Sequence, residues 1–568
     1  MRVGLAGGGA SGGIIDLFAW FSLAAVALVC FLPVAIIIVG SFSEGNPFND
    51  FRGSLDPWMR ALDSSQTLRS IGYSLLLSLR VPAALLVSFG VAWYLARNDV
   101  FGKRTIMYAL WLAFFLPILP ATLGWILLLD PNYGIINTYA DKLIGIPVLN
   151  IYSLAGITWV HLTLSTIPIM VILIEPAQRF IDTSYEEAST MSGAGTITTL
   201  ERVTLPLIAP TLLTACIAGM IKSLEAFEVE QVLGVPAGIL VYSTRVFNLL
   251  RISPPDEPQA MALSTFFLAI LFVLVACYRL LLLRAQMVAT LTGKGARLFA
   301  RERTRGSYLV SGLLFAALMV TVVLPFSMVA VSSFSALFGF FNLEHPWTAA
   351  HWREVLQRPA FTSALGQSVF IGMVVAMAGT LLYLAIAWFI ARHSFRGKSA
   401  LSLAIWLPWA IPGVLLGTAF LSMFLNVPGL RLAYGTTVAL IVVLMVQGLP
   451  FATHMFEGSI SQISRELEEA SLMSGAAPFE TVRRITTPLI APMVASVFIM
   501  SFMTAMKDIS ATVLVATPGT QTLPLLMFSY AVSGRLEDAS VVGVVTVVIA
   551  SLMAFLATRV GDRAAVMR

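Results

Sequence analysis

The decapeptide EEASTMSGAG (Glu186–Gly195) recurs almost unchanged, further along the chain, as EEASLMSGAA (Glu468–Ala477). A second pair of matching segments occurs in the same order. AWYLARNDVFGK (Ala92–Lys103) matches AWFIARHSFRGK (Ala387–Lys398) at a similar spacing. Matches in one order at nearly constant spacing indicate an internal repeat, so the chain consists of two similar halves.

The composition places the chain in a membrane. Charged residues make up 11% of the 568 residues and hydrophobic residues make up 58%, whereas a soluble domain carries about 25% charged residues. Apolar runs of about 20 residues, the length of a helix that crosses a bilayer, recur along the chain. We therefore predict an all-α integral membrane protein with about twelve transmembrane helices. The predicted spans are residues 17–40, 70–96, 106–129, 151–174, 206–224, 261–283, 308–331, 366–390, 401–425, 436–456, 488–506 and 540–558.

Six predicted spans fall in each copy of the repeat. Residues 1–284 form the first half, residues 307–568 form the second, and a basic linker (residues 285–306) joins them. Because an even number of spans separates equivalent positions, the two halves cross the membrane in the same direction. Parallel repeats of this kind pack about an axis along the membrane normal. The sequence thus predicts a pseudo-twofold body with a pathway between its halves.

Most of the 35 Lys and Arg residues lie in alternate loops, on the side of the membrane that holds both termini. Basic loops stay in the cytoplasm by the positive-inside rule, so we predict that both termini and the linker are cytoplasmic. We interpret the basic clusters as topology determinants and expect no nucleic-acid partner. The three cysteines, Cys30, Cys216 and Cys277, all lie in apolar runs, and no Cys/His spacing predicts a metal site.

In each half the repeated block lies in a cytoplasmic loop, between the fourth and fifth predicted spans. Glu186 and Glu187 stand near the expected helix start, where the helix dipole favours anions, and Gly193 provides a turn that ends the helix. Such a helix is either an ordinary amphipathic connector or a docking site, and its duplication at equivalent places favours paired docking sites. The predicted docking residues are Glu186, Glu187, Ala188, Ser189, Met191 and Gly193 in the first copy, and Glu468, Glu469, Ala470, Ser471, Met473 and Gly475 in the second.

The two blocks resemble the EAA loop of binding-protein-dependent ABC importer permeases, in which Glu-Ala-Ala is followed by Gly and then by Ile-x-Leu-Pro. The first copy matches from Glu187 to Pro206 and the second from Glu469 to Pro488. The departures are Ser189 and Ser471 for the second Ala, Val203 for Ile and Thr487 for Leu.

The layout of the chain narrows the resemblance to one group. Two fused halves, with SFS at the ends of their first spans (Ser41–Ser43 and Ser333–Ser335), resemble the ferric-iron permeases, whose relatives handle thiamine, phosphonates and polyamines. Ferric iron is therefore the first expectation for the solute.

The resemblance implies a transport subunit rather than an enzyme. The chain has no G-x-x-x-x-G-K-[ST] loop that could hold nucleotide phosphates, and no catalytic residues are expected in it. By resemblance, two copies of a separate cytoplasmic ATPase dock on the two EAA blocks and supply ATP-Mg, while this chain binds no cofactor. A periplasmic binding protein delivers the solute, and the complex lies in the bacterial inner membrane.

Charged residues near the outer ends of the fifth spans are candidates for the solute pathway, because polar groups deep in a membrane tend to face a cavity or a protein interior. Lys222 and Lys507 lie in comparable places of the two halves. These side chains either line the pathway or reach the outer interface as local ion pairs. Arg80, inside the second span, either faces the pathway or pairs with an acidic group. The candidates are Lys222, Glu225, Glu228, Lys507, Asp508 and Arg80.

Two other classes of protein remain open from the residues alone. An ion-coupled secondary transporter also has twelve spans in two parallel halves, but it needs no paired docking helices. A membrane enzyme would need a nucleophile–base pair or a set of metal ligands, and the sequence shows no such pattern.

Overall fold

The computed structural model describes residues 10–45, 51–145, 149–286, 305–341, 343–393, 395 and 397–566. Within these ranges the chain is helical, with two isolated antiparallel bridges, Ser43 with Gly53 and Ser335 with Trp347, and no longer strand. The predicted all-α class is confirmed. Most of the predicted basic linker, residues 287–304, lies outside the described residues.

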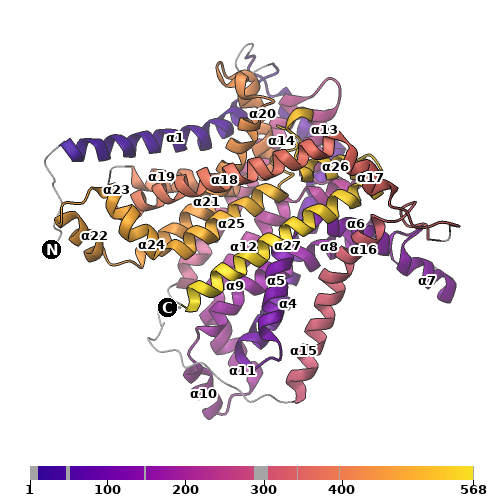
Figure 1. The fold of residues 1–568 in the computed structure, drawn as a ribbon, viewed down its shortest axis with the longest axis horizontal. Coiled ribbons are helices and arrows are strands. Elements are labelled where there is room, and N and C mark those ends of the chain that lie inside the picture. The colour runs from indigo at the N-terminus through magenta and orange to yellow at the C-terminus, as the bar shows by residue number, and fades with distance from the viewer. Residues whose placement is uncertain are drawn as a thin grey trace.

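The helices follow a similar, though not identical, order in the two halves, and Figure 1 shows their arrangement. The first half contains α1 (Ala10–Gly40), α2 (Asp56–Asp63), α3 (Ser65–Ser78), α4 (Arg80–Arg97), α5 (Lys103–Phe115), α6 (Ile118–Leu129), α7 (Ile135–Ile144), α8 (Leu154–His161), α9 (Ile167–Arg179), α10 (Thr183–Met191), α11 (Thr196–Thr199), α12 (Leu205–Glu225), α13 (Tyr242–Arg251) and α14 (Glu257–Gln286). The second half contains α15 (Arg305–Leu318), α16 (Leu324–Ser332), α17 (Ala350–Gln357), α18 (Pro359–Arg392), α19 (Lys398–Trp406), α20 (Gly413–Asn426), α21 (Thr437–Ser461), α22 (Arg465–Met473), α23 (Pro478–Thr481), α24 (Thr487–Leu489), α25 (Ala491–Lys507), α26 (Leu523–Val532) and α27 (Leu536–Val566).

Shorter π-helical and 3-10 segments connect these helices. The π-helical segments are η1 (Leu162–Thr166), η2 (Leu200–Thr204), η3 (Glu230–Gly234), η4 (Met319–Val323) and η7 (Val482–Thr486), and the 3-10 segments are η5 (Leu407–Ala410), η6 (Leu430–Ala433) and η8 (Pro518–Thr520). Segments η2 and η7 occupy matching positions of the repeat and lead into the fifth span of each half.

The number of spans depends on how the bent helices are counted. Among the described residues, eight helices are long and apolar enough to cross a membrane, and up to eleven spans result if each of three bent helix pairs counts as one. The first predicted span falls in α1, where Ala24–Gly40 is a shorter apolar helix. The exact count of twelve is therefore not confirmed, although every predicted span coincides with a helix or a bent pair.

The third span of each half is bent sharply. Helices α5 and α6 meet at 99°, and the second-half pair α19 and α20 meets at 109°. Prolines lie at both breaks, at Pro117 in the first half and at Pro408 and Pro412 in the second. Proline lacks the N–H of a helical hydrogen bond and its ring clashes with the preceding turn, so a helix breaks there.

The first span of each half packs against the other half. Helix α1 packs on α19 and α20 of the second half, and α16 packs on α6 of the first. Figure 1 shows α1 lying beside α19 and reaching α20. The approach of α16 is close because Gly124 of α6 has no side chain: a Cβ at this position would lie 1.9 Å from the Pro325 carbonyl oxygen. The two halves are thus held together by exchanged helices.

We predict that Gly124→Ala destabilises the protein, since α16 must move away from α6 to admit the methyl group. Overpacking of this kind costs about 1–3 kcal/mol, so the purified protein should unfold several degrees lower in a thermal scan. Gly90→Ala is the matched control, because a Cβ there meets nothing within 4 Å. Equal unfolding temperatures for the two variants would contradict this account of the packing.

Candidate functional site

The two copies of the EEAS block form short helices with the same beginning and the same end. Helix α10 is capped by Asp182, whose side chain accepts a hydrogen bond from the Ser184 N–H, and α22 is capped by Ser464 in the same way. After each helix a glycine takes a positive φ, 85° at Gly193 and 88° at Gly475. This left-handed turn suits glycine and stops the helix.

The first glutamate of each block anchors its helix to the end of the second span. Glu186 accepts hydrogen bonds from Arg97 Nη2 at 2.8 Å and from Thr204 Oγ1 at 3.1 Å. In the second half, Glu468 lies 2.8 Å from Arg392 Nε and accepts a hydrogen bond from Thr486 Oγ1 at 2.7 Å. Arg97 and Arg392 end the matched AWYLAR and AWFIAR segments. The anchoring is therefore duplicated along with the blocks.

The serine of each block adds a second anchor. Ser189 Oγ lies 2.9 Å from Thr199 Oγ1, and Ser471 Oγ lies 2.9 Å from Thr481 Oγ1. These bonds hold each helix against the segment that leads into the fifth span. Glu186, Ser189 and their second-half counterparts therefore position the helices.

The remaining side chains of each block face away from the protein. Glu187, Ala188, Glu469 and Ala470 are exposed, while Met191 and Met473 have exposed fractions of 90% and 88%. We call these six residues, Glu187, Ala188, Met191, Glu469, Ala470 and Met473, the docking surface. Figure 1 shows α10 and α22 at the same side of the molecule as the start of α15 and the end of α27.

The residues predicted for the solute pathway form two groups. Lys222, Glu225, Glu228, Lys507 and Asp508 interact electrostatically with one another, and we call these five residues the interior charge cluster. Arg80 lies apart from them. Its side chain is buried, with Nη1 3.5 Å from Glu230 Oε1, and the same oxygen lies 2.9 Å from His161 Nε2. Of the two alternatives predicted for Arg80, facing the pathway or pairing with an acidic group, the structure favours the pairing, with Glu230.

The interior charge cluster lies where the fifth spans end and the halves meet. Lys222 Nζ lies 2.7 Å from Glu225 Oε2, and its side chain is 59% exposed. Helix α12 ends at Glu225 and helix α25 ends at Lys507. The number of residues between Glu225 and Lys507 is the same as between the first glutamates of the two EEAS blocks. The structural match is therefore Glu225 with Lys507, and the predicted match of Lys222 with Lys507 is out of register by about one helical turn.

Three partners of the cluster were not predicted from the sequence. Glu225 Oε1 accepts a hydrogen bond from the Gly413 N–H at 3.2 Å, and Lys507 Nζ donates to the Phe114 carbonyl oxygen at 3.0 Å. Gln447 Nε2 donates to Asp508 Oδ2 at 3.0 Å. Gly413 and Phe114 act through their backbones at the breaks of the third spans, so only the nearby prolines could have indicated them.

We predict that Arg97→Met and Arg392→Met loosen α10 and α22, respectively. Removing one partner of a fully buried ion pair costs about 3–5 kcal/mol. The effect should be larger for Arg392, since the Glu468 side chain is 10% exposed and that of Glu186 is 24% exposed. Hydrogen–deuterium exchange should accelerate across Thr183–Met191 and Arg465–Met473. Glu187→Gln and Glu469→Gln serve as controls, and unchanged exchange in the arginine variants would argue against the anchors.

Comparison with known proteins gives a family. Residues 383–565 match the family model described as binding-protein-dependent transport system inner membrane component. A putative ABC transporter permease protein of Streptomyces antibioticus is 32% identical over 184 residues, which cover 32% of this chain and 78% of that protein.

Two relatives match over most of the chain. A ferric transport system permease protein of Actinobacillus pleuropneumoniae is 25% identical over 562 residues, covering 96% of this chain and 79% of the relative. A putative ferric transport system permease protein of Haemophilus influenzae is 25% identical over 515 residues, covering 89% and 79%.

Among solved structures, a bacterial ABC transporter involved in alginate import aligns over 47% of this chain and 95% of that chain, at 18% identity and a TM-score of 0.41. The family model matches within the last third of the chain, and the two ferric relatives match over most of it. The chain belongs to the inner membrane components of binding-protein-dependent transport systems, as the permease of an ABC importer.

Proposed function

We propose that this permease imports ferric iron, driven by two copies of a cytoplasmic ATPase that dock on α10 and α22. In this proposal the docking helices and both termini lie in the cytoplasm. A periplasmic binding protein delivers the iron at the end of the molecule opposite to the docking helices. The iron passes between the two halves, along the interior charge cluster. The chain itself supplies the path and holds no nucleotide.

The docking proposal rests on one observation: within each block, some side chains anchor the helix to the protein and others are exposed to solvent. One glutamate and one serine are used for anchoring, at 2.7–3.1 Å in both halves. The adjacent glutamate and the methionine are left in solvent. A methionine is a flexible side chain that adapts to a groove on a partner. Two such surfaces on the same side suit two identical subunits, and the rigid anchors would pass the motion of the ATPases to the second and fifth spans.

The proposal of iron is supported by the two relatives named as ferric transport permeases and by the chemistry of the interior charge cluster. The cluster contains three carboxylates, of Glu225, Glu228 and Asp508, and two ammonium groups, so acidic groups are in excess. Oxygen ligands suit hard cations. In this proposal the three carboxylates attract the cation and do not form a fixed metal site, since among the described residues no group of three or more His, Cys, Asp or Glu side chains could hold a metal ion. A phosphonate is the main alternative solute, because a protein of Salmonella typhi described as a putative 2-aminoethylphosphonate transport system permease is 27% identical over 254 residues, covering 45% of this chain and 94% of that protein.

For the docking surface, we predict that Glu187→Arg combined with Glu469→Arg abolishes co-purification of the ATPase. Reversing two exposed charges should reduce the affinity by at least about tenfold, which corresponds to about 1.4 kcal/mol. The unfolding temperature should stay unchanged, since neither residue anchors its helix. Asp141→Arg, on exposed α7, is the matched control. Normal co-purification and uptake by the double variant would refute the docking role.

For the solute, we predict that Glu228→Gln lowers ferric iron uptake by about tenfold in vesicles that contain the ATPase and the iron-loaded binding protein, because a favourable charge interaction is lost. Lys222→Gln is the opposite-sign control and should not lower uptake. If the natural solute is an anionic phosphonate, the order reverses and Lys222→Gln is the damaging change. Uptake without binding protein, driven by a proton gradient, would instead favour an ion-coupled transporter.

A further inference from the structure

The last residue of the fifth span crosses between the halves at both matched positions. In the first half this residue is Glu225, whose Oε1 reaches the Gly413 N–H of the second half at 3.2 Å. In the second half it is Lys507, whose Nζ reaches the Phe114 carbonyl oxygen of the first half at 3.0 Å and lies 4.9 Å from the centre of the Phe114 ring. Each fifth span therefore contacts the bent third span of the other half.

The sign of each charge fits the helix end that it contacts. Gly413 is the first residue of α20, and the free N–H groups at a helix start carry a partial positive charge. Phe114 lies in the last turn of α5, where free carbonyl groups carry a partial negative charge. A carboxylate at the first end and an ammonium group at the second are both stabilising. Neither contact requires a direct ion pair between Glu225 and Lys507.

The two contacts are connected through a short turn of the second half. A Cβ on Gly413 would lie 2.2 Å from Ser510 Oγ, so the start of α20 is pressed against the residues that follow Lys507. The same turn is held by Asp508, whose Oδ1 accepts a hydrogen bond from the Ala511 N–H at 3.2 Å. The start of α20 and the end of α25 therefore lie in close contact beside the two crossing charges.

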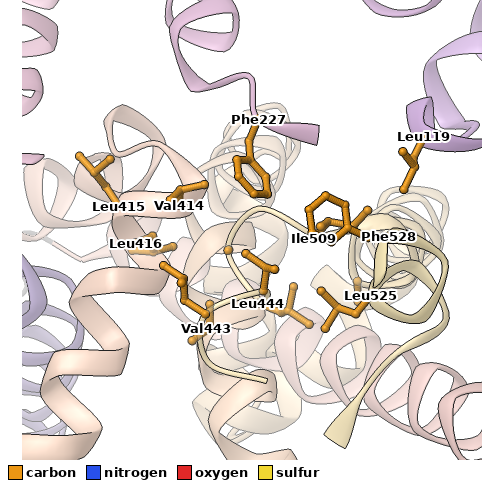
Figure 2. Close-up of a cluster of buried hydrophobic side chains, with 14 of the residues drawn as sticks. Leu119, Phe227, Val414, Leu415, Leu416, Val443, Leu444, Ile509, Leu525 and Phe528 are labelled. Carbon is orange, nitrogen blue, oxygen red and sulfur yellow. The ribbon is translucent and has the colours of Figure 1, made fainter. Parts of the chain in front are cut away.

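Beside these contacts, apolar side chains fill the space between the halves. Figure 2 shows Phe227 of the first half close to Val414, Ile509 and Phe528 of the second. The Phe227 ring centre lies 5.7 Å from that of Phe528 and 5.1 Å from that of Phe247. Phe247 and Phe528 occupy equivalent places in α13 and α26, and their ring centres are 6.4 Å apart. The halves are thus closed against each other at this level.

Each crossing charge also has a further charged neighbour in the interior charge cluster. Glu225 Oε2 is held by Lys222 Nζ at 2.7 Å in its own half, and Lys507 interacts electrostatically with Glu228 of the first half and with Asp508. When Glu225 leaves the Gly413 N–H, its ion pair with Lys222 remains, which matters because an unpaired charge in the protein interior is strongly unfavourable. The Glu225 contact can therefore open without leaving that charge unpaired.

We infer that Glu225 and Lys507 form a latch between the halves, and that both must release the opposite third span before solute can pass. This inference rests on the importer function of the family and is independent of which solute is carried. The contacts hold the closed arrangement, and the binding protein and the ATPases supply the energy that opens it.

The latch is tested by ATP hydrolysis in the absence of solute and binding protein. We would reconstitute the permease with its ATPase in proteoliposomes and compare wild type with Glu225→Gln, Glu225→Asp and Lys507→Met. Glu225→Gln removes the charge but keeps an acceptor oxygen, Glu225→Asp keeps the charge but draws the carboxylate back from the Gly413 N–H, and Lys507→Met removes the ammonium group. Each change weakens one crossing contact, so basal ATP hydrolysis should rise about five- to tenfold. Asp141→Asn and Lys142→Met, on exposed α7, are the matched controls and should leave the basal rate unchanged.

A charge exchange separates a latch on helix ends from a direct ion pair. In Glu225→Lys with Lys507→Glu, an ion pair would be restored, whereas each side chain would now face a helix end of the wrong sign. We expect the double variant to keep the raised basal rate. A wild-type basal rate in the single variants, or its recovery in the exchanged pair, would overturn the latch. If the permease does not carry iron, iron uptake will be absent, but the basal hydrolysis rates of these variants will still change as expected.

Discussion

A helix that breaks inside a membrane leaves backbone N–H and C=O groups that lipid cannot satisfy, and this constraint organises the centre of the permease. Such groups are tolerated only where protein or water provides partners. In both halves the third span breaks near prolines, and the partners come from the opposite half: a carboxylate for the start of α20 and an ammonium group for the end of α5. The halves are therefore bonded to each other at the breaks of the third spans, where backbone groups lack partners within their own helix.

The first spans of the two halves are exchanged in the same way. Helix α1 lies on the second half and α16 on the first, with Gly124 allowing the closest approach. Each half consequently has two kinds of contact with the other half: apolar packing, which also fills the space beside the central charges, and the charged contacts at the breaks of the third spans. The apolar contact has no directional preference and can persist during motion, whereas the charged contacts depend on position and can open in discrete steps.

The sequence was sufficient to predict the class of fold, because long apolar runs and a repeat are properties of composition and order. It also located the short helices α10 and α22, since their residues are contiguous. It could not separate the anchoring Glu186 from the exposed Glu187: neighbouring residues point to different sides of a helix, and their roles depend on where Arg97 and Thr204 lie in space. The register of Lys507 with Glu225 was missed for a related reason, because a lysine one helical turn before Glu225 suggested a different match from the one that the helix ends define.

Fusion of the two halves into one chain gives the central contacts their asymmetry. In a symmetric dimer of identical halves, the positions of Glu225 and Lys507 would carry one residue type, and like charges would meet near the axis. A single chain can place opposite charges at matched positions, so that one suits a helix start and the other a helix end. It can also keep a group in only one half: Arg80, Glu230 and His161 form a buried cluster in the first, while buried apolar residues stand around the places that match Arg80 and His161, namely Val375, Val443 and Leu444. The repeat thus gives the two halves the same arrangement of helices. The residues that differ between the two copies, such as Glu225 and Lys507, provide the charged contacts between the halves.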